Sequence, residues 1–275
     1  MYAKIKSKIF KPENLKEYFS LIKNLKNYKP VAGGTDLIVK IKTENIQFEN
    51  LIIISHIKEL KGIYEKNDYI FIGAGNTFSE LIENPLIKKY TSLYKAIKSI
   101  GSPQIRNVAT IGGNIVNASP SADSVPALLL YDAELLISDG KKEYCKKLSE
   151  FFISAYNTIL KENELIIGVK IKNLNEKKSD FFKIGHRKAL AISRINLAYS
   201  VLNDNSWRIS LGAVTPFPIR LTSCEELFNS GIINKEKIKK SLENDIYKYS
   251  KPRKSYEYKL PVIEELLEKI YNIWN

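Results

Sequence analysis

Two short loops that contain adjacent glycines constrain this chain more than any other feature of its sequence. The first is Val31-Ala32-Gly33-Gly34-Thr35-Asp36-Leu37 and the second is Thr110-Ile111-Gly112-Gly113-Asn114, each beside an apolar run of strand-like composition. Adjacent glycines carry no Cβ, so consecutive amide N–H groups can turn into a concavity that an anionic group can approach. The sequence therefore predicts two backbone sites that could hold a diphosphate from both sides.

Length and composition place the chain among globular proteins with a sizeable core. It has 275 residues, of which 44% are hydrophobic, and this length is typical of two domains. The first six residues form no continuous apolar segment, and no stretch approaches the roughly 18 apolar residues that a membrane helix needs. We therefore expect a cytoplasmic protein that does not insert into a membrane.

Charge and cysteine content narrow the classes of function. The formal net charge is +13, but the lysines are scattered and form no basic stripe, so we do not expect nucleic-acid binding. A basic surface suits docking onto an acidic partner subunit instead. The only cysteines, Cys145 and Cys224, belong to no Cys-x-x-Cys motif, which argues against an iron–sulfur cluster or zinc held by this chain alone.

Apolar periodicity predicts the secondary structure around the loops. Helical spacing is found over residues 15–25, 36–42 and 261–270, and strand-like runs over 51–55, 69–73 and 207–212. Thr77 and Glu80 have the spacing of a capping box, which places a helix start just after the glycines at 73 and 75.

Neither a Rossmann fingerprint nor a Walker loop fits the glycine positions. The Rossmann pattern needs a third small residue where helix and strand pack closely, and here Phe78 occupies that position. In a Walker loop the glycines are followed by Lys-Ser or Lys-Thr, whereas Gly33-Gly34 is followed by Thr35-Asp36. We interpret residues 73–78 as an ordinary strand-to-helix turn.

Asp123 has two interpretations that the residues around it leave open. It directly precedes an apolar run, residues 124–130, that we expect to be a helix. Its carboxylate either caps this helix or accepts hydrogen bonds from ribose hydroxyls. Because acidic residues are common at helix N-termini, the local sequence favours the cap.

The motifs taken together resemble the FAD-binding subunit of the molybdenum hydroxylases, a family that includes xanthine dehydrogenase, the carbon monoxide dehydrogenase medium chain and nicotinate dehydrogenase. The resemblance rests on the two glycine loops and on four further segments. These are Ala118-Ser119-Pro120-x-x-Asp123, Phe181-Phe182-Lys183, the run Leu211-Gly212-Ala213-Val214-Thr215-Pro216 with its continuation to Arg220, and Arg253-x-Ser255-x-x-Tyr258-Lys259. Their order and separation span nearly the whole chain.

This resemblance implies an α+β fold with a flavin domain of the p-cresol methylhydroxylase type. Two α/β subdomains, the second of mostly antiparallel strands, would hold a non-covalent FAD between them over residues 1–175. Residues 176–275 would form a small C-terminal α+β domain, and the polar run 173–179 marks the boundary.

The resemblance also implies the residues that contact FAD. The two loops would cradle the pyrophosphate through backbone amides and the hydroxyls of Thr35 and Thr110, while Asp123 would bind ribose. The full set is Val31, Ala32, Gly33, Gly34, Thr35, Asp36, Leu37, Ile100, Thr110, Ile111, Gly112, Gly113, Asn114, Asp123, Ile167 and Lys183.

Two positions depart from the family pattern. Ile100 stands where eukaryotic xanthine dehydrogenases carry an aromatic residue stacked on the flavin, so it offers apolar contact without π-stacking. Lys259 replaces an arginine of the late motif and lacks the planar fork of a guanidinium.

The function implied is electron transfer. Electrons would pass from a [2Fe–2S] cluster on a partner subunit through FAD to NAD or another acceptor, while a third subunit carries molybdopterin and binds the organic substrate. No catalytic residue or metal ligand is expected in this chain, which has two histidines and no Gly-x-Ser-x-Gly elbow. The alternative is a freestanding FAD-dependent oxidoreductase of the p-cresol methylhydroxylase superfamily with its own substrate pocket.

Overall fold

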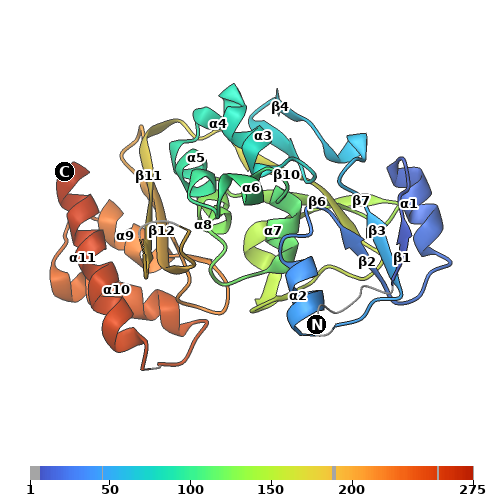
Figure 1. The fold of residues 1–275 in the computed structure, drawn as a ribbon. Helices are drawn as coiled ribbons and strands as arrows, with labels where there is room; N and C mark the ends of the chain where they lie inside the picture. The colour runs from blue at the N-terminus through green and yellow to red at the C-terminus, as the bar shows by residue number, and fades with distance from the viewer. Residues whose placement is uncertain (1–6, 45, 188–189, 253, 275) are drawn as a thin grey trace.

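The computed structural model describes residues 7–44, 46–187, 190–252 and 254–274. Its strands form three main sheets that follow one another along the length of the molecule (Figure 1). Arg253, part of the late family motif, lies outside the described residues.

A small parallel sheet forms the N-terminal part. Its central strand β3 pairs with β1 and β2, and such parallel pairs need crossover connections, which α1 and α2 provide. Helix α1 begins where the Asn14 side chain accepts a hydrogen bond from the Glu17 N–H (2.9 Å), and it buries Tyr18 and Phe19. The elements are β1 (Lys8–Phe10), α1 (Leu15–Ile22), β2 (Tyr28–Val31), α2 (Leu37–Thr43) and β3 (Asn50–Ile53).

A five-stranded antiparallel sheet forms the middle part, in the order β4-β5-β10-β6-β7. Its central strand β10 returns to the sheet long after β5, and the helices of the intervening segment pack their apolar sides into one large core with the sheet. The strands are β4 (Ile63–Lys66), β5 (Tyr69–Gly73), β6 (Glu134–Ser138), β7 (Glu143–Lys147) and β10 (Leu165–Lys172), with the small hairpin β8 (Phe152–Ser154) and β9 (Asn157–Thr158). The helices are α3 (Phe78–Glu83), α4 (Pro85–Lys88), α5 (Thr91–Lys98), α6 (Pro103–Arg106), α7 (Ile111–Asn117) and α8 (Ser124–Leu130), with short turns η1 (Lys58–Leu60) and η2 (Leu148–Glu150).

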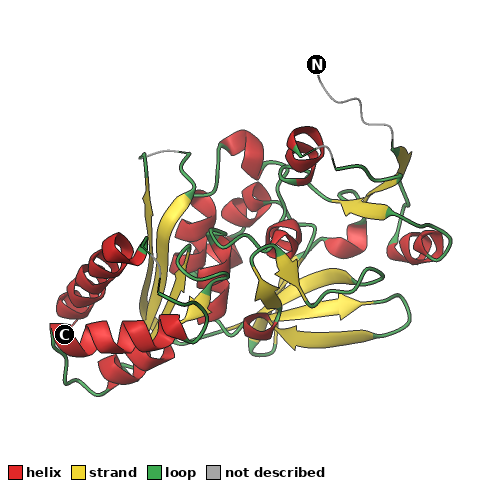
Figure 2. Ribbon diagram, turned by 90° about the horizontal axis from the view of Figure 1, so that it is seen from below, coloured by secondary structure: helices red, strands yellow, loops and turns green. Residues whose placement is uncertain are grey.

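A four-stranded antiparallel sheet with three helices forms the C-terminal part. The sheet lies between α5 and α8 on one face and the C-terminal helices on the other (Figure 2). The closing helix is longer than the predicted 261–270, because Tyr256 and Leu260 also pack on this core. The elements are β11 (Glu176–Gly185), β12 (Ser193–Leu202), β13 (Trp207–Gly212), β14 (Ile219–Arg220), α9 (Thr222–Asn229), α10 (Lys235–Tyr247) and α11 (Tyr256–Trp274).

The chain changes sheet between Lys172 and Glu176, at the predicted domain boundary. The contacts do not stop there, since Phe181 and Ala198 of the C-terminal sheet belong to the large middle core. Lys259, at the position that departs from the family motif, donates to the Ala213 carbonyl (2.6 Å), so α11 keeps a contact with the segment after β13. A boundary at residue 175 stays a prediction.

The predicted capping box after β5 is present. Thr77 accepts a hydrogen bond from the Glu80 N–H (3.2 Å), and the Glu80 carboxylate accepts one from the Thr77 N–H (2.6 Å). Phe78, the residue that breaks the Rossmann pattern, is fully buried in the large core.

We expect Thr77→Ala to lower the free energy of unfolding by about 1 kcal/mol, because the Glu80 amide then loses its acceptor at the start of α3. Urea denaturation of the two proteins measures this difference. The matched control is Ser79→Ala, in the same turn, because the Ser79 hydroxyl donates to the Asn107 side chain (2.6 Å) and accepts no cap hydrogen bond. An equal loss in both variants would contradict the capping explanation.

Candidate functional site

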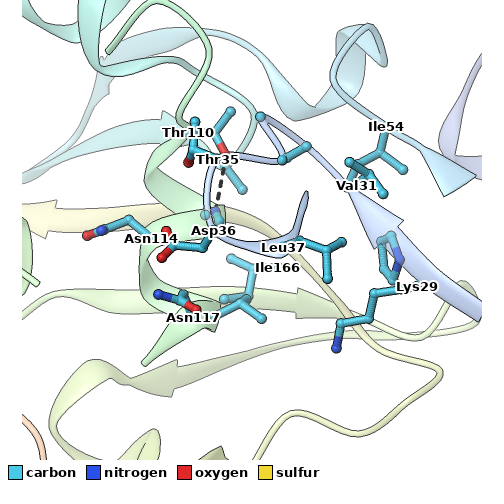
Figure 3. Close-up of a pocket in the computed structure, with 18 of the residues that line it drawn as sticks. Lys29, Val31, Thr35, Asp36, Leu37, Ile54, Thr110, Asn114, Asn117 and Ile166 are labelled. Atoms are coloured by element: carbon cyan, nitrogen blue, oxygen red, sulfur yellow. Dashed lines mark hydrogen bonds between the residues drawn. The ribbon is translucent and has the colours of Figure 1, made fainter. Parts of the chain in front are cut away.

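The two glycine loops line one cleft. The first loop connects β2 to α2 and the second opens α7, and Figure 3 shows residues of both loops around the same space. They meet closely, since a Cβ built on Gly33 would lie 2.0 Å from the carbonyl oxygen of Val108. Gly112 also packs closely, against the turn after β5, where a Cβ would lie 2.7 Å from the Cβ of Ala74. The glycines therefore permit close backbone packing that other residues would prevent.

The cleft has a volume of about 570 Å³, within the range of small-molecule and cofactor sites. Its walls come from β2 and α2, from α7, from the β8–β9 hairpin and from the start of β10. Of the residues predicted from sequence, it brings together Val31, Ala32, Gly33, Gly34, Thr35, Asp36, Leu37, Ile100, Thr110, Gly112, Gly113 and Asn114.

The first loop offers unengaged backbone donors to this cleft. Among the described residues, the N–H groups of residues 33–37 donate no hydrogen bond. Gly34 has φ of 69°, in the left-handed region that glycine adopts without steric cost, and this turns the chain between β2 and α2. Successive free N–H groups in a turn form an anion-binding concavity, so this loop fits a phosphate group.

The second loop uses its donors differently. Ile111 and Gly112 donate their N–H groups to the carbonyls of Asn76 and Ala74 (3.1 and 2.9 Å), which joins α7 to the turn after β5. Gly113 and Asn114 donate to the side chain and carbonyl of Thr110 (3.1 and 2.9 Å), as expected for a capped helix start. The N–H groups of residues 111–114 are therefore engaged within the protein, unlike those of the first loop. Thr110 and Asn114 are the residues with polar side chains that this loop adds to the cleft wall, and contact of this loop with a pyrophosphate stays a prediction.

Asp123 and Lys183 lie apart from the residues that line the cleft and form a buried ion pair. The Lys183 Nζ is 2.6 Å from Oδ2 of Asp123, while Ser193 Oγ and Asn196 Nδ2 donate to Oδ1 (2.5 and 2.8 Å). The capping role that the local sequence favoured for Asp123 is wrong, because its side chain makes no cap hydrogen bond to α8. The carboxylate forms an ion pair with Lys183 from the C-terminal sheet instead of binding the N–H groups at the start of α8. Binding of ribose by Asp123 stays a prediction.

Two apolar candidates also point away from the cleft. Ile111 is fully buried in the large core, and Ile167 packs in the core beneath the N-terminal sheet. The neighbour of Ile167, Ile166, is among the residues that line the cleft, and it packs in the large core on the other face of β10.

Several cleft residues carry no sequence pattern that could have identified them. Lys40, Asn117 and Tyr156 line the cleft from α2, α7 and the β8–β9 hairpin. Helical spacing in α2 would place Lys40 one turn after Asp36, but nothing local shows which face of α2 meets the cleft. Among the described residues there is no cluster of side chains suited to hold a metal ion, and no helix long and apolar enough to cross a membrane.

Comparison with known proteins identifies the family. A family model described as "FAD binding domain in molybdopterin dehydrogenase" matches residues 4–172. The xanthine dehydrogenase FAD-binding subunit of Escherichia coli O157:H7 is 31% identical over 93% of this chain and 91% of its own length. The nicotinate dehydrogenase FAD-subunit of Eubacterium barkeri is 30% identical over 95% of this chain and 94% of its own length.

Solved structures show the same fold. A chain of carbon monoxide dehydrogenase from Hydrogenophaga pseudoflava superposes with a TM-score of 0.85 and 24% identity, covering 96% of this chain and 95% of that chain. The predicted α+β fold class, the oxidoreductase class and FAD as cofactor are thereby confirmed. The chain belongs to the family of FAD-binding domains of molybdopterin dehydrogenases, as an FAD-binding subunit.

Proposed function

We propose that this chain carries FAD in the cleft between its glycine loops and passes electrons from a [2Fe–2S] subunit to NAD or another acceptor. The observation that carries this proposal is the row of unengaged N–H groups over residues 33–37, at a cleft of about 570 Å³. These donors suit the negatively charged bridge of a dinucleotide.

The chain's own residues bind and orient the cofactor. FAD, when bound, would supply the redox chemistry, accepting electrons singly and releasing a hydride to a nicotinamide. The N–H groups of residues 33–37 would hold the diphosphate, and the apolar side chains of Val31, Ile100 and Ile166 would exclude water from the cleft. The chain needs no nucleophile or metal of its own for this role.

Partners carrying a [2Fe–2S] cluster and molybdopterin are part of the same proposal. It is supported by the relatives, which are named as FAD subunits of xanthine and nicotinate dehydrogenases and therefore belong to larger enzymes. A cytoplasmic location, the absence of nucleic-acid binding and NAD as the acceptor stay predictions of the sequence.

Native purification from the source cell tests this function. We expect a yellow complex of three subunits that contains iron and molybdenum, and whose flavin is released by denaturation and runs as FAD. Xanthine, nicotinate and carbon monoxide, each with NAD or an artificial acceptor, then identify the substrate class. A chain that purifies without flavin would overturn the proposal, and a flavoprotein that purifies alone would favour the freestanding oxidoreductase.

A further inference from the structure

Lys40 places a cation at a defined position on the cleft wall. It lies on α2, which begins where the first glycine loop ends, and its side chain lines the cleft. Its Nζ donates to Oδ1 of Asn117 on α7 (3.0 Å) and lies 4.5 Å from the centre of the Tyr156 ring. Figure 1 shows α2 beside α7. The Lys40–Asn117 hydrogen bond therefore links the helix that follows the first glycine loop to the helix that contains the second.

Both partners of Lys40 are electrically neutral. Within the described part of the chain, no carboxylate oxygen lies within 4.0 Å of its ammonium group. Two other lysines line the cleft, and both are exposed: Lys29, and Lys161, which is 3.7 Å from Glu164 and has a side chain that is 73% exposed. Lys40 is half-buried, so its charge is less screened by solvent than that of Lys161. Asp36, Glu162 and Glu164 also line the cleft, but none of them forms an ion pair with Lys40. Lys40 therefore adds a positive charge without a direct carboxylate partner to a cleft that already presents free N–H groups.

The backbone around Tyr156 is strained in a way that fixes this arrangement. Tyr156 has φ of 60°, and Ala118, the C-cap residue of α7, has φ of 48°. Both values lie in the left-handed region, which is unfavourable for residues that carry a Cβ. The Tyr156 N–H donates to the Ala118 carbonyl (2.8 Å) and ties the hairpin turn to the end of α7. Such conformations persist where surrounding contacts hold them, and they gather at ligand-binding sites.

We infer that Lys40, held by Asn117 and Tyr156, is the cation that this chain sets against the diphosphate of its bound dinucleotide. This inference rests on the proposed function. The N–H groups of residues 33–37 supply dipoles to the phosphate oxygens but no full positive charge, and Lys40 supplies that charge at the same cleft. The Asn117 amide and the Tyr156 ring keep the ammonium in place before the cofactor enters, which lowers the cost of ordering a long side chain.

Flavin fluorescence titrations of the stripped protein test this role without measuring activity. We expect Lys40→Met to raise the Kd of FAD about tenfold at low salt, the size of one lost charge-assisted hydrogen bond. The difference should shrink to less than about threefold at roughly 1 M salt, where charge interactions are screened. Lys40→Arg should stay within about threefold of the natural chain, because it keeps the charge.

Three further variants separate the effect of charge from the effect of side-chain shape. Lys42→Met removes the same charge from an exposed position on the same helix, outside the residues that line the cleft, and should leave the Kd within about twofold. Tyr156→Phe keeps the ring beneath Lys40 and should bind FAD normally, whereas Tyr156→Leu should bind it a few-fold more weakly. A Lys40→Met protein with unchanged affinity would overturn the inference, as would a defect that persists at high salt and in Lys40→Arg. A natural chain that binds no FAD would instead refute the proposed function on which this inference depends.

Discussion

Gly33→Ala is expected to abolish FAD retention and to destabilise the chain by about 3 kcal/mol. The new Cβ would lie 2.0 Å from the carbonyl oxygen of Val108, 2.6 Å from its carbonyl carbon and 2.9 Å from Cα of Ala109. All three are backbone atoms, so no side-chain rotation relieves the overlap, and one loop must move away from the other. Such a shift would displace the free N–H groups of residues 33–37 from the cofactor.

Thermal unfolding and flavin titration measure the two effects of Gly33→Ala separately. Loss of two charge-assisted hydrogen bonds corresponds to at least about a 100-fold increase in the Kd of FAD. Gly231→Ala is the matched control, because Gly231 has φ of 70° but no atom within 4 Å of a built Cβ. That variant should lose about 1 kcal/mol from backbone strain and bind FAD normally. Normal flavin binding by Gly33→Ala would show that the contact between the loops does not shape the site.

Asp123→Asn is expected to cost about 3 kcal/mol of stability even without cofactor. Asp123 is 6% exposed, and its carboxylate accepts hydrogen bonds from Lys183, Ser193 and Asn196, which lie on β11 and β12 of the C-terminal sheet. Removing its charge leaves the Lys183 ammonium, whose side chain is 16% exposed, without its ion-pair partner. Breaking a buried ion pair in this way typically costs about 3–5 kcal/mol.

Chemical denaturation of the flavin-free protein checks the Asp123 prediction. The double variant Asp123→Asn with Lys183→Met should recover part of the loss, because it removes the unpaired charge as well. Asp180→Asn is the control, since the Lys95–Asp180 pair joins α5 to β11 but has side chains that are 49% and 28% exposed. That change should cost less than about 1 kcal/mol. A normal stability of the flavin-free Asp123→Asn protein, together with weaker FAD binding, would assign Asp123 to the cofactor instead.

Local sequence predicts those elements whose causes lie within a few residues. The capping box of Thr77 and Glu80 needs only two side chains three positions apart, and it is present. The apolar spacing of residues 207–212 likewise matches β13, and that of residues 15–25 matches α1 up to Ile22, where the helix ends. Helix α11 was predicted too short at its N-terminal end, because the burial of Tyr256 depends on a core built from distant strands.

The choice between neighbouring residues was beyond local sequence. Ile166 and Ile167 are chemically identical, but the two faces of β10 place Ile166 in the large core beside the cleft and Ile167 in the core under the N-terminal sheet. The same holds for Asp123, whose place before a helix suggested a cap. Its carboxylate instead accepts hydrogen bonds from three side chains on strands that follow 60 or more residues later in the sequence.

By itself, the sequence determined where glycines allow tight turns, and hence where exposed backbone N–H groups can bind an anion. The tertiary structure alone decided that the two loops share one cleft, that only the first keeps its N–H donors free, and that Lys40 lines the same cleft. Glycine's freedom is a property of one residue, whereas a hydrogen-bond partner or a buried charge is a property of segments that only folding brings together.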